Sequence, residues 1–144
     1  MGSIRRLYRL AAVDRALLGR ATLWLGVTRV ALWLLPLRVV RRLLTWAARP
    51  ARQARGAPPS QERIRWALSI ACRAVPRATC LPQALAAQAL LACHGHRAEL
   101  RVGVIKSDAG YLLAHAWVES EGQIVVGNVR GLSRYKPLPA LPTP

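Results

Sequence analysis

The sequence predicts an α+β domain in which helices come first and an antiparallel sheet follows. Before Gly95, apolar residues recur at helical spacing or stand in runs rich in Ala and Leu. After Gly95 the period changes to two, because Leu100, Val102 and Val104 alternate with Glu99, Arg101 and Gly103. Helices followed by strands, rather than alternating with them, are typical of the α+β class.

The chain is short and strongly basic. Its 144 residues suffice for one domain, or for one domain with a helical extension, and a hydrophobic fraction of 53% suffices for a core. Lys and Arg number 22 against 6 Asp and Glu, which gives a net charge of +16. Such a surface favours nucleic acid, anionic lipid or an acidic protein. No stacking platform or recognition-helix pattern accompanies the arginines, so we expect no nucleic-acid partner.

Residues 1–56 form a basic block that holds 12 arginines and a single acid. We expect two helices here, over 4–34 with a break at its glycines and over 36–48. They make an N-terminal basic amphipathic extension to a domain of residues 57–144. Arg29 divides the uncharged stretch, so the block falls short of a membrane-spanning helix. Three interpretations follow: the helices pack on the domain, lie on an anionic membrane surface, or bind a partner protein.

The remaining elements follow from local signals. Ser60 suits a helix N-cap, and Glu121-Gly122 has the composition of a tight hairpin turn. The tail after Arg130 carries four prolines and is expected to be irregular. The expected elements are a linker over 50–60, helices over 61–75 and from Cys80 to about 92, and strands over 98–106, 111–120 and 123–127.

The segment around Cys80 places a thiol where a helix begins. Pro82 fits a first helical turn, and Gly95 suits a left-handed cap at the other end. The positive end of a helix dipole stabilises a thiolate, so this position favours a nucleophilic Cys80. Cys72 and Cys93 lie farther along their helices, and Cys72 is expected to be a buried, inert thiol.

His115 stands later in the chain, within a predicted strand that reads Ala-His-Ala-Trp-Val-Glu. A cysteine at a helix start and a histidine on a later strand are what papain-like and transglutaminase-like thiol enzymes need. The thiolate attacks a carbonyl, and the imidazole takes and returns the proton. The backbone N–H of Cys80 is the simplest donor to the oxyanion. Taken alone, a cysteine and a histidine are each more often structural, so the pair also has a non-catalytic interpretation.

Metal and cofactor chemistry are not expected. The segment Cys93-His94 with His96 lacks the second pair of ligands that a structural zinc site uses. His94 and His96 are expected to be solvated loop residues, and no glycine-rich phosphate loop is present. The three cysteines are an odd number, and no signal-peptide cleavage site follows the apolar run. We therefore expect a cytoplasmic protein, with peripheral association at the membrane as the alternative location.

The chain resembles the B2 proteins of lasso peptide biosynthesis, which are transglutaminase-like leader peptidases. The resemblance runs from Ile64 to Asn128, and the run at 31–38 is similar to that family's opening segment. Its specific parts are Cys-Leu-Pro-Gln-Ala-Leu at 80–85 and His-Ala-Trp-Val-Glu at 115–119. It implies a papain/transglutaminase-like cysteine peptidase core that hydrolyses the leader–core amide bond of a ribosomally made lasso precursor peptide.

The resemblance also implies partners and a third catalytic residue. The partners are a separate leader-recognition protein, usually called B1, and an ATP-using cyclase resembling asparagine synthetase. The family commonly has an aspartate after the His-Ala-Trp segment, but no aspartate follows Asp108 here. Asn128 is the expected substitute, because asparagine can orient an imidazole. Pairing residues back from a two-residue turn predicts that Asn128 lies opposite His115.

One alternative from a different class remains. The chain would then be a non-catalytic basic scaffold that binds an acidic protein partner or an anionic membrane surface. The reactivity of Cys80 discriminates between the two, because only the enzyme needs a thiolate near neutral pH.

Overall fold

The structure is a computed structural model that describes residues 11–50 and 57–139. In these residues four α-helices are followed by a four-stranded antiparallel sheet, so the α+β prediction is confirmed. The sheet order is β3-β2-β1-β4. The helices are α2 (Ala12–Leu34), α3 (Leu37–Ala47), α4 (Gln61–Ala74) and α5 (Cys80–Cys93), and the strands are β1 (Glu99–Lys106), β2 (Leu112–Ser120), β3 (Gln123–Val126) and β4 (Lys136–Pro137), with a 3-10 turn η1 (Leu132–Arg134) before β4.

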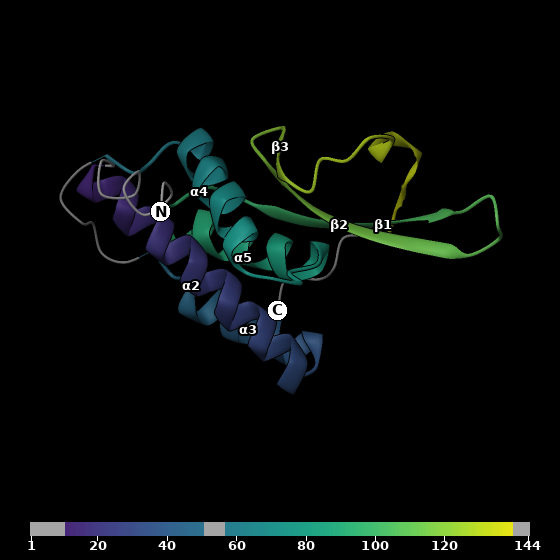
Figure 1. Ribbon diagram of the computed structural model, residues 1–144, viewed down its shortest axis with the longest axis horizontal. Helices are drawn as coiled ribbons and strands as arrows, with labels where there is room; N and C mark the ends of the chain where they lie inside the picture. The colour runs from purple at the N-terminus through teal and green to yellow at the C-terminus, as the bar shows by residue number, and fades with distance from the viewer. Residues whose placement is uncertain (1–10, 51–56, 140–144) are drawn as a thin grey trace.

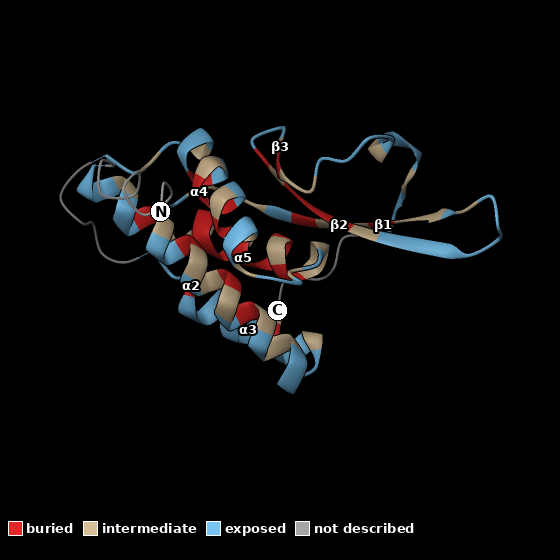
Figure 2. Cartoon of the chain, viewed as in Figure 1, coloured by how far each residue is buried: buried red, intermediate tan, exposed pale blue. Residues whose placement is uncertain are grey.

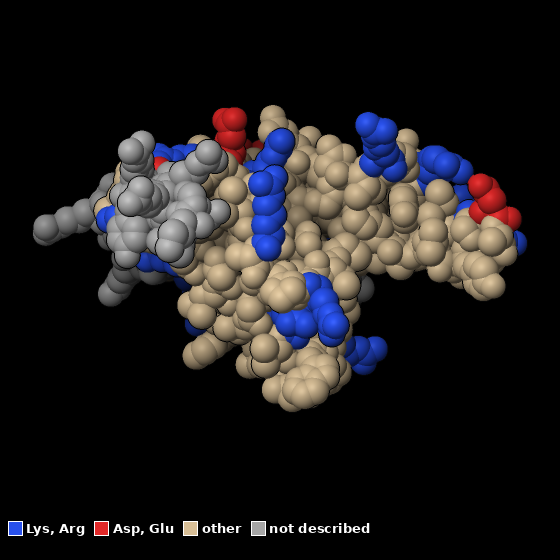
Figure 3. All heavy atoms as spheres, in the orientation of Figure 1, with Lys and Arg blue, Asp and Glu red and all other residues tan. Residues whose placement is uncertain are grey.

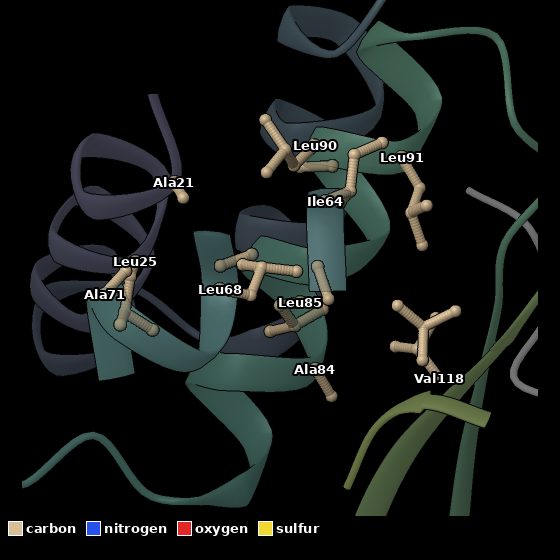
Figure 4. Packing of buried hydrophobic residues seen from close by; sticks show 14 of the residues in the cluster. Ala21, Leu25, Ile64, Leu68, Ala71, Ala84, Leu85, Leu90, Leu91 and Val118 are labelled. Carbon is tan, nitrogen blue, oxygen red and sulfur yellow. The ribbon is translucent and has the colours of Figure 1, made fainter. Parts of the chain in front are cut away.

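The helices gather at one end of the sheet, and the β1–β2 hairpin projects beyond them (Figure 1). Helices α2 and α4 pack on α5, and α5 packs on β1, β2 and β3. One hydrophobic core therefore runs from the N-terminal helices into the sheet, and Figure 4 shows side chains such as Leu25, Leu68, Leu85 and Val118 within it. The interpretation that the N-terminal helices pack on the domain is confirmed.

Helix α2 differs from the expected N-terminal helix in two ways. It is continuous over 23 residues, so the break expected at its glycines is absent. By length and composition α2 could also cross a membrane, contrary to our expectation. The core helices of globular proteins and signal sequences meet the same criterion, and 22% of the most apolar 18 residues of α2 is buried. An ion pair between Asp14 and Arg63 joins α2 to α4. Residues 4–10 of the expected helix and 51–56 of the expected linker lie outside the described residues.

The helix ends follow the sequence signals. The Ser60 hydroxyl accepts from the backbone N–H of Arg63 at 3.3 Å, which caps α4 as predicted. Gly95 has φ +79°, and the backbone N–H of His96 donates to the Leu91 carbonyl at 3.0 Å. This left-handed glycine and its returning hydrogen bond end α5 in the way that the sequence predicts.

The turn between β2 and β3 is tight, but the register behind it shifts. Glu121 and Gly122 have φ of 49° and 78°, as a two-residue hairpin turn requires. Ser120 pairs with Gln123 as predicted. Val118, however, pairs with Val126 instead of Val125, so the predicted register is wrong. The bulge lets both valines reach the core, since Val125 is buried and Val126 packs against the same cluster.

The segment after Arg130 is more ordered than expected. Strand β4 pairs with Gly103 and Val104 of β1, and the backbone N–H of Leu138 donates to the Val102 carbonyl at 2.8 Å. The irregular-tail prediction is therefore wrong for β4, while residues 140–144 lie outside the described part. Because β4 pairs with the middle of β1, it brings the end of the described chain back to the sheet and forms its edge beside β1.

Burial changes along β2 (Figure 2). Leu112, Leu113 and Ala114 are exposed, whereas residues 116–118 are buried. His115 stands between these two parts of the strand and is half-buried. The histidine therefore lies where the helix-covered part of the hairpin meets its projecting part.

Candidate active site

Cys80 is the first residue of α5, as the sequence predicts. Thr79 before it is extended, and the side-chain amide of Gln83 donates to the Ala78 carbonyl at 2.6 Å. This bond fixes the chain where it enters the helix. Cys80 is half-buried and packs at the margin of the core. Because it is the first residue of a 14-residue helix, its thiol stands at the positive end of the helix dipole.

The other two cysteines have different surroundings. Burial raises the pKa of the Cys72 thiol in α4. Burial also raises the pKa of the Cys93 thiol at the end of α5, although the nearby Arg20 guanidinium lowers it in part. Both thiols therefore hold their protons at neutral pH more firmly than an ordinary cysteine does. Neither stands at a helix N-terminus, which leaves Cys80 as the candidate nucleophile.

The imidazole of His115 has one defined hydrogen bond. Its Nε2 lies 2.7 Å from the backbone carbonyl oxygen of Gly127. A carbonyl oxygen accepts only, so Nε2 carries the proton and donates it. The neutral ring then keeps its lone pair on Nδ1, which is the atom free to take a proton from a thiol.

Aromatic side chains frame the same ring. The Trp117 ring stacks beside that of His115, with centroids 6.4 Å apart and planes at 17°, and the Tyr135 centroid lies 5.6 Å away. Gly103 of β1 pairs with His115, and a Cβ there would lie 2.9 Å from the Trp117 ring and 3.0 Å from the Tyr135 Cβ. A glycine at this position therefore makes room for both aromatic residues.

Gly127 is equally constrained. Its φ is +89°, and a Cβ would lie 2.7 Å from both the Ala116 carbonyl oxygen and the Trp117 Cβ. Only glycine brings this backbone so close to β2 while its carbonyl meets the imidazole. Sequence analysis missed Gly127, Tyr135 and Gly103 as parts of the site. The available signal was the glycine within each predicted strand, which marks a close approach of the backbone.

Asn128 is exposed, and its side chain forms no hydrogen bond within the described residues. The bulge at Val125 also shifts the β2–β3 register, so the predicted pairing of Asn128 with His115 no longer follows from the turn. Its predicted role as third catalytic residue is therefore still to be tested, and the Gly127 carbonyl is the group that holds the imidazole in this structure. Glu119 is occupied elsewhere, because it accepts from the Trp117 indole at 2.8 Å and lies 3.7 Å from the Arg101 Nε.

The helix that begins at Cys80 and the strand that holds His115 pack together, but the two side chains form no hydrogen bond with each other. Helix α5 packs on β2. Within the part of the chain that the structure describes, no hydrogen bond joins the Cys80 sulfur to the imidazole. Strand alternation puts His115 and Trp117 on the face opposite Ala116 and Val118, which pack among the helices. The imidazole therefore lies on the sheet face away from α5, and its pairing with Cys80 stays a prediction.

The histidines of the α5–β1 connection are not solvated loop residues. Burial, together with Arg20 and His96, lowers the pKa of His94. His96 Nε2 lies 2.9 Å from the Pro59 carbonyl oxygen, and its side chain is only 18% exposed. Among the described residues, no three His, Cys, Asp or Glu side chains are arranged to hold a metal ion. These histidines serve the connection between α5 and the sheet.

Comparison with known families decides the class. The pattern of the Transglutaminase-like superfamily matches residues 22–140, which is more than half of the 144 residues. The chain belongs to the Transglutaminase-like superfamily. Members of this superfamily are typically Cys-His hydrolases. No curated protein and no solved structure matches the chain. The matched range begins inside α2, so it includes part of the block that the sequence assigns to an extension.

Proposed function

We propose that this transglutaminase-like protein is a cysteine peptidase that removes the leader from a lasso peptide precursor. Superfamily membership supports Cys-His hydrolysis, and the resemblance of the 80–85 and 115–119 motifs to B2 proteins supports the substrate class. The observation that carries the proposal is the position of Cys80. Its sulfur stands at the start of α5, the helix that packs on the strand of His115.

The proposed reaction is hydrolysis through a thioester. The Cys80 sulfur attacks the scissile carbonyl carbon, and Nδ1 of His115 takes the thiol proton. The imidazolium then gives that proton to the departing amine, which frees the N-terminus of the core peptide. Water attacks the thioester while His115 takes its proton, and the released leader ends in a carboxylate. We assign the oxyanion in both steps to the backbone N–H of Cys80, since the first backbone N–H groups of a helix have no acceptor within the helix.

The Gly127 carbonyl has a supporting role in this scheme. It accepts from Nε2 of His115 and so holds the neutral tautomer whose lone pair is on Nδ1. When Nδ1 gains the proton, the same carbonyl stabilises the positive imidazolium, because hydrogen bonds from charged donors are stronger. A backbone group therefore supplies the orientation that an aspartate supplies in related sites.

The test is cleavage of a lasso precursor, followed by mass spectrometry of leader and core. We expect Cys80→Ala to lower the rate by more than about 10³-fold, since it removes the nucleophile. Cys72→Ser and Cys93→Ser are matched controls and should retain most of the rate, because both thiols are held protonated within helices. Comparable cleavage by the Cys80→Ala protein would contradict the proposal.

We also propose that B1 supplies most of the affinity for the leader. Binding of one precursor by both proteins would raise the effective concentration of its scissile bond at Cys80. Adding B1 should therefore raise the cleavage rate at low precursor concentration, and the free core amine would pass to the cyclase. Equal rates with and without B1 would show that this chain binds the leader unaided.

A further inference from the structure

Helix α2 has an apolar stripe on its outer face. The opposite face is in the core, since Leu17, Ala21 and Leu25 are almost fully buried. On the outer face Leu23 and Leu34 are each 65% exposed, and an open groove runs along the stripe from Gly19 to Leu35. The stripe consists of Leu23, Val27, Val30 and Leu34, which recur at helical spacing.

Helix α3 continues this pattern directly after α2. Val40 and Leu44 are buried, whereas Val39, Leu43 and Trp46 are exposed at 38%, 49% and 67%. Trp33, next to the α2 stripe, is 84% exposed. Two large indoles thus stand in solvent on neighbouring helices. Tryptophan is the residue that best suits the boundary between headgroups and acyl chains of a lipid bilayer.

The charge around these stripes has one sign. Between Arg15 and Arg49 the sequence contains five further arginines and no acidic residue. On the face in Figure 3, acidic atoms appear near α4 and at the tip of the β1–β2 hairpin, while the lower part, formed by α2 and α3, shows only basic and uncharged atoms. An apolar stripe bordered by arginines is complementary to acyl chains below a layer of phosphates.

We propose that the outer faces of α2 and α3 bind an anionic membrane surface. This inference does not depend on the proposed peptidase activity. The helices would lie in the interface rather than span the bilayer, because the other side of α2 packs on α4 and α5. A spanning α2 would expose the core residues Leu17 and Leu25. An acidic protein would satisfy the arginines but would leave the exposed indoles without an apolar environment.

The test uses the full chain and sedimentation with lipid vesicles. We expect binding to vesicles of phosphatidylcholine with phosphatidylglycerol, weak binding to phosphatidylcholine alone, and release by salt, since salt screens exposed charges over about 10 Å or less. The variant Leu23→Ser/Val30→Ser/Leu34→Ser should weaken binding by at least about tenfold through lost apolar contact. Arg38→Gln/Arg42→Gln should weaken it by about tenfold or more through lost attraction to phosphate.

The hairpin provides a matched control. Tyr111, Leu112 and Leu113 are exposed at 72%, 74% and 49%, much like the α2 stripe, and they lie far from it along the chain. Their triple serine variant should bind vesicles like the unchanged protein. Brominated lipid should quench part of the tryptophan fluorescence only in the bound state, and Trp33→Ser, which leaves the core untouched, should reduce that quenched part.

Three results would overturn the proposal. The first is equal binding to neutral and anionic vesicles, or no binding to either at physiological salt. The second is an equal loss of binding in the hairpin variant. The third is a concentration-dependent dimer, or a tight complex with B1, that the α2 stripe variant abolishes while vesicle binding is absent. That result would assign the stripe to a protein partner.

Discussion

The two faces of the sheet have different roles, so substitutions on each face should affect a different property of the protein. The inner face joins the core with Leu100, Ala116, Val118 and Val125, placed there by strand alternation together with the bulge at Val125. The outer face holds an imidazole, its backbone acceptor and two aromatic rings, with Gly103 beneath them. Changes on the inner face should therefore lower stability, whereas changes on the outer face should lower activity first.

His115→Ala should give the largest separation of the two effects. Loss of a general acid and base lowers turnover by about 10²–10⁴-fold. The ring is half-buried and outside the core cluster, so the free energy of unfolding should change little. Val118→Ala on the inner face is the matched change, and it should cost about 1–3 kcal/mol of stability while turnover per folded molecule persists. Denaturant unfolding and precursor cleavage measure both, and a stable but fully active His115→Ala protein would contradict the contrast.

Gly103→Ala should affect stability and activity together. The new methyl would meet the Trp117 ring at 2.9 Å, so the ring must shift and disturb its stacking on His115. Overpacking of this kind costs about 1–3 kcal/mol. Gly26→Ala is the control, because a methyl there meets nothing within 4 Å and should stabilise α2 by up to about 1 kcal/mol. Similar melting temperatures for the two variants would show that the outer face is loosely packed.

The sequence was sufficient for the helices and the long strands because periodicity and caps are local signals. Ser60, Gly95 and Glu121-Gly122 each act within a few residues, and each has the predicted geometry. The bulge at Val125 was not predictable from the turn, because it depends on how two valines fit a core made by distant helices. The short β4 depends likewise on tertiary contact with β1.

The candidate site could likewise be predicted only in part, because some of its geometry depends on tertiary contacts. Cys80 and His115 could be located from residue type and local structure. The acceptor for the imidazole is the carbonyl of Gly127, and every residue has such a carbonyl, so no residue type identifies it. Its glycine was visible, but its function depends on the bulge that moves it toward β2.

Thiol chemistry should distinguish the start of α5 from the interior of the helical layer. A stoichiometric thiol reagent near neutral pH should label Cys80 ahead of Cys72 and Cys93, since burial raises the pKa of the latter two. A raised pKa delays thiolate formation to higher pH, so the difference should shrink as pH rises through and above the ordinary thiol range. Peptide mapping after timed quenching measures the order. Preferential labelling of Cys72 or Cys93 at neutral pH would count against Cys80 as nucleophile.

Asn128→Ala should have the smallest effect, and it tests which group holds the imidazole. When the orienting group of a catalytic triad is a side chain, its replacement lowers kcat by about 10⁴-fold. Here Nε2 of His115 already donates to the Gly127 carbonyl at 2.7 Å, and a side-chain change at the next residue leaves that carbonyl in place. Asn128 is exposed, so its truncation should not unfold the chain. We expect turnover, KM and the pH profile to stay near those of the unchanged protein, as for Glu119→Gln, which keeps an acceptor for the Trp117 indole. A loss beyond about a hundredfold with an altered pH profile would instead give the orienting role to the Asn128 amide, as in Cys-His-Asn sites. It would also mean that the bulge rearranges when the precursor binds, because the register of β3 does not keep the pairing that places Asn128 opposite His115.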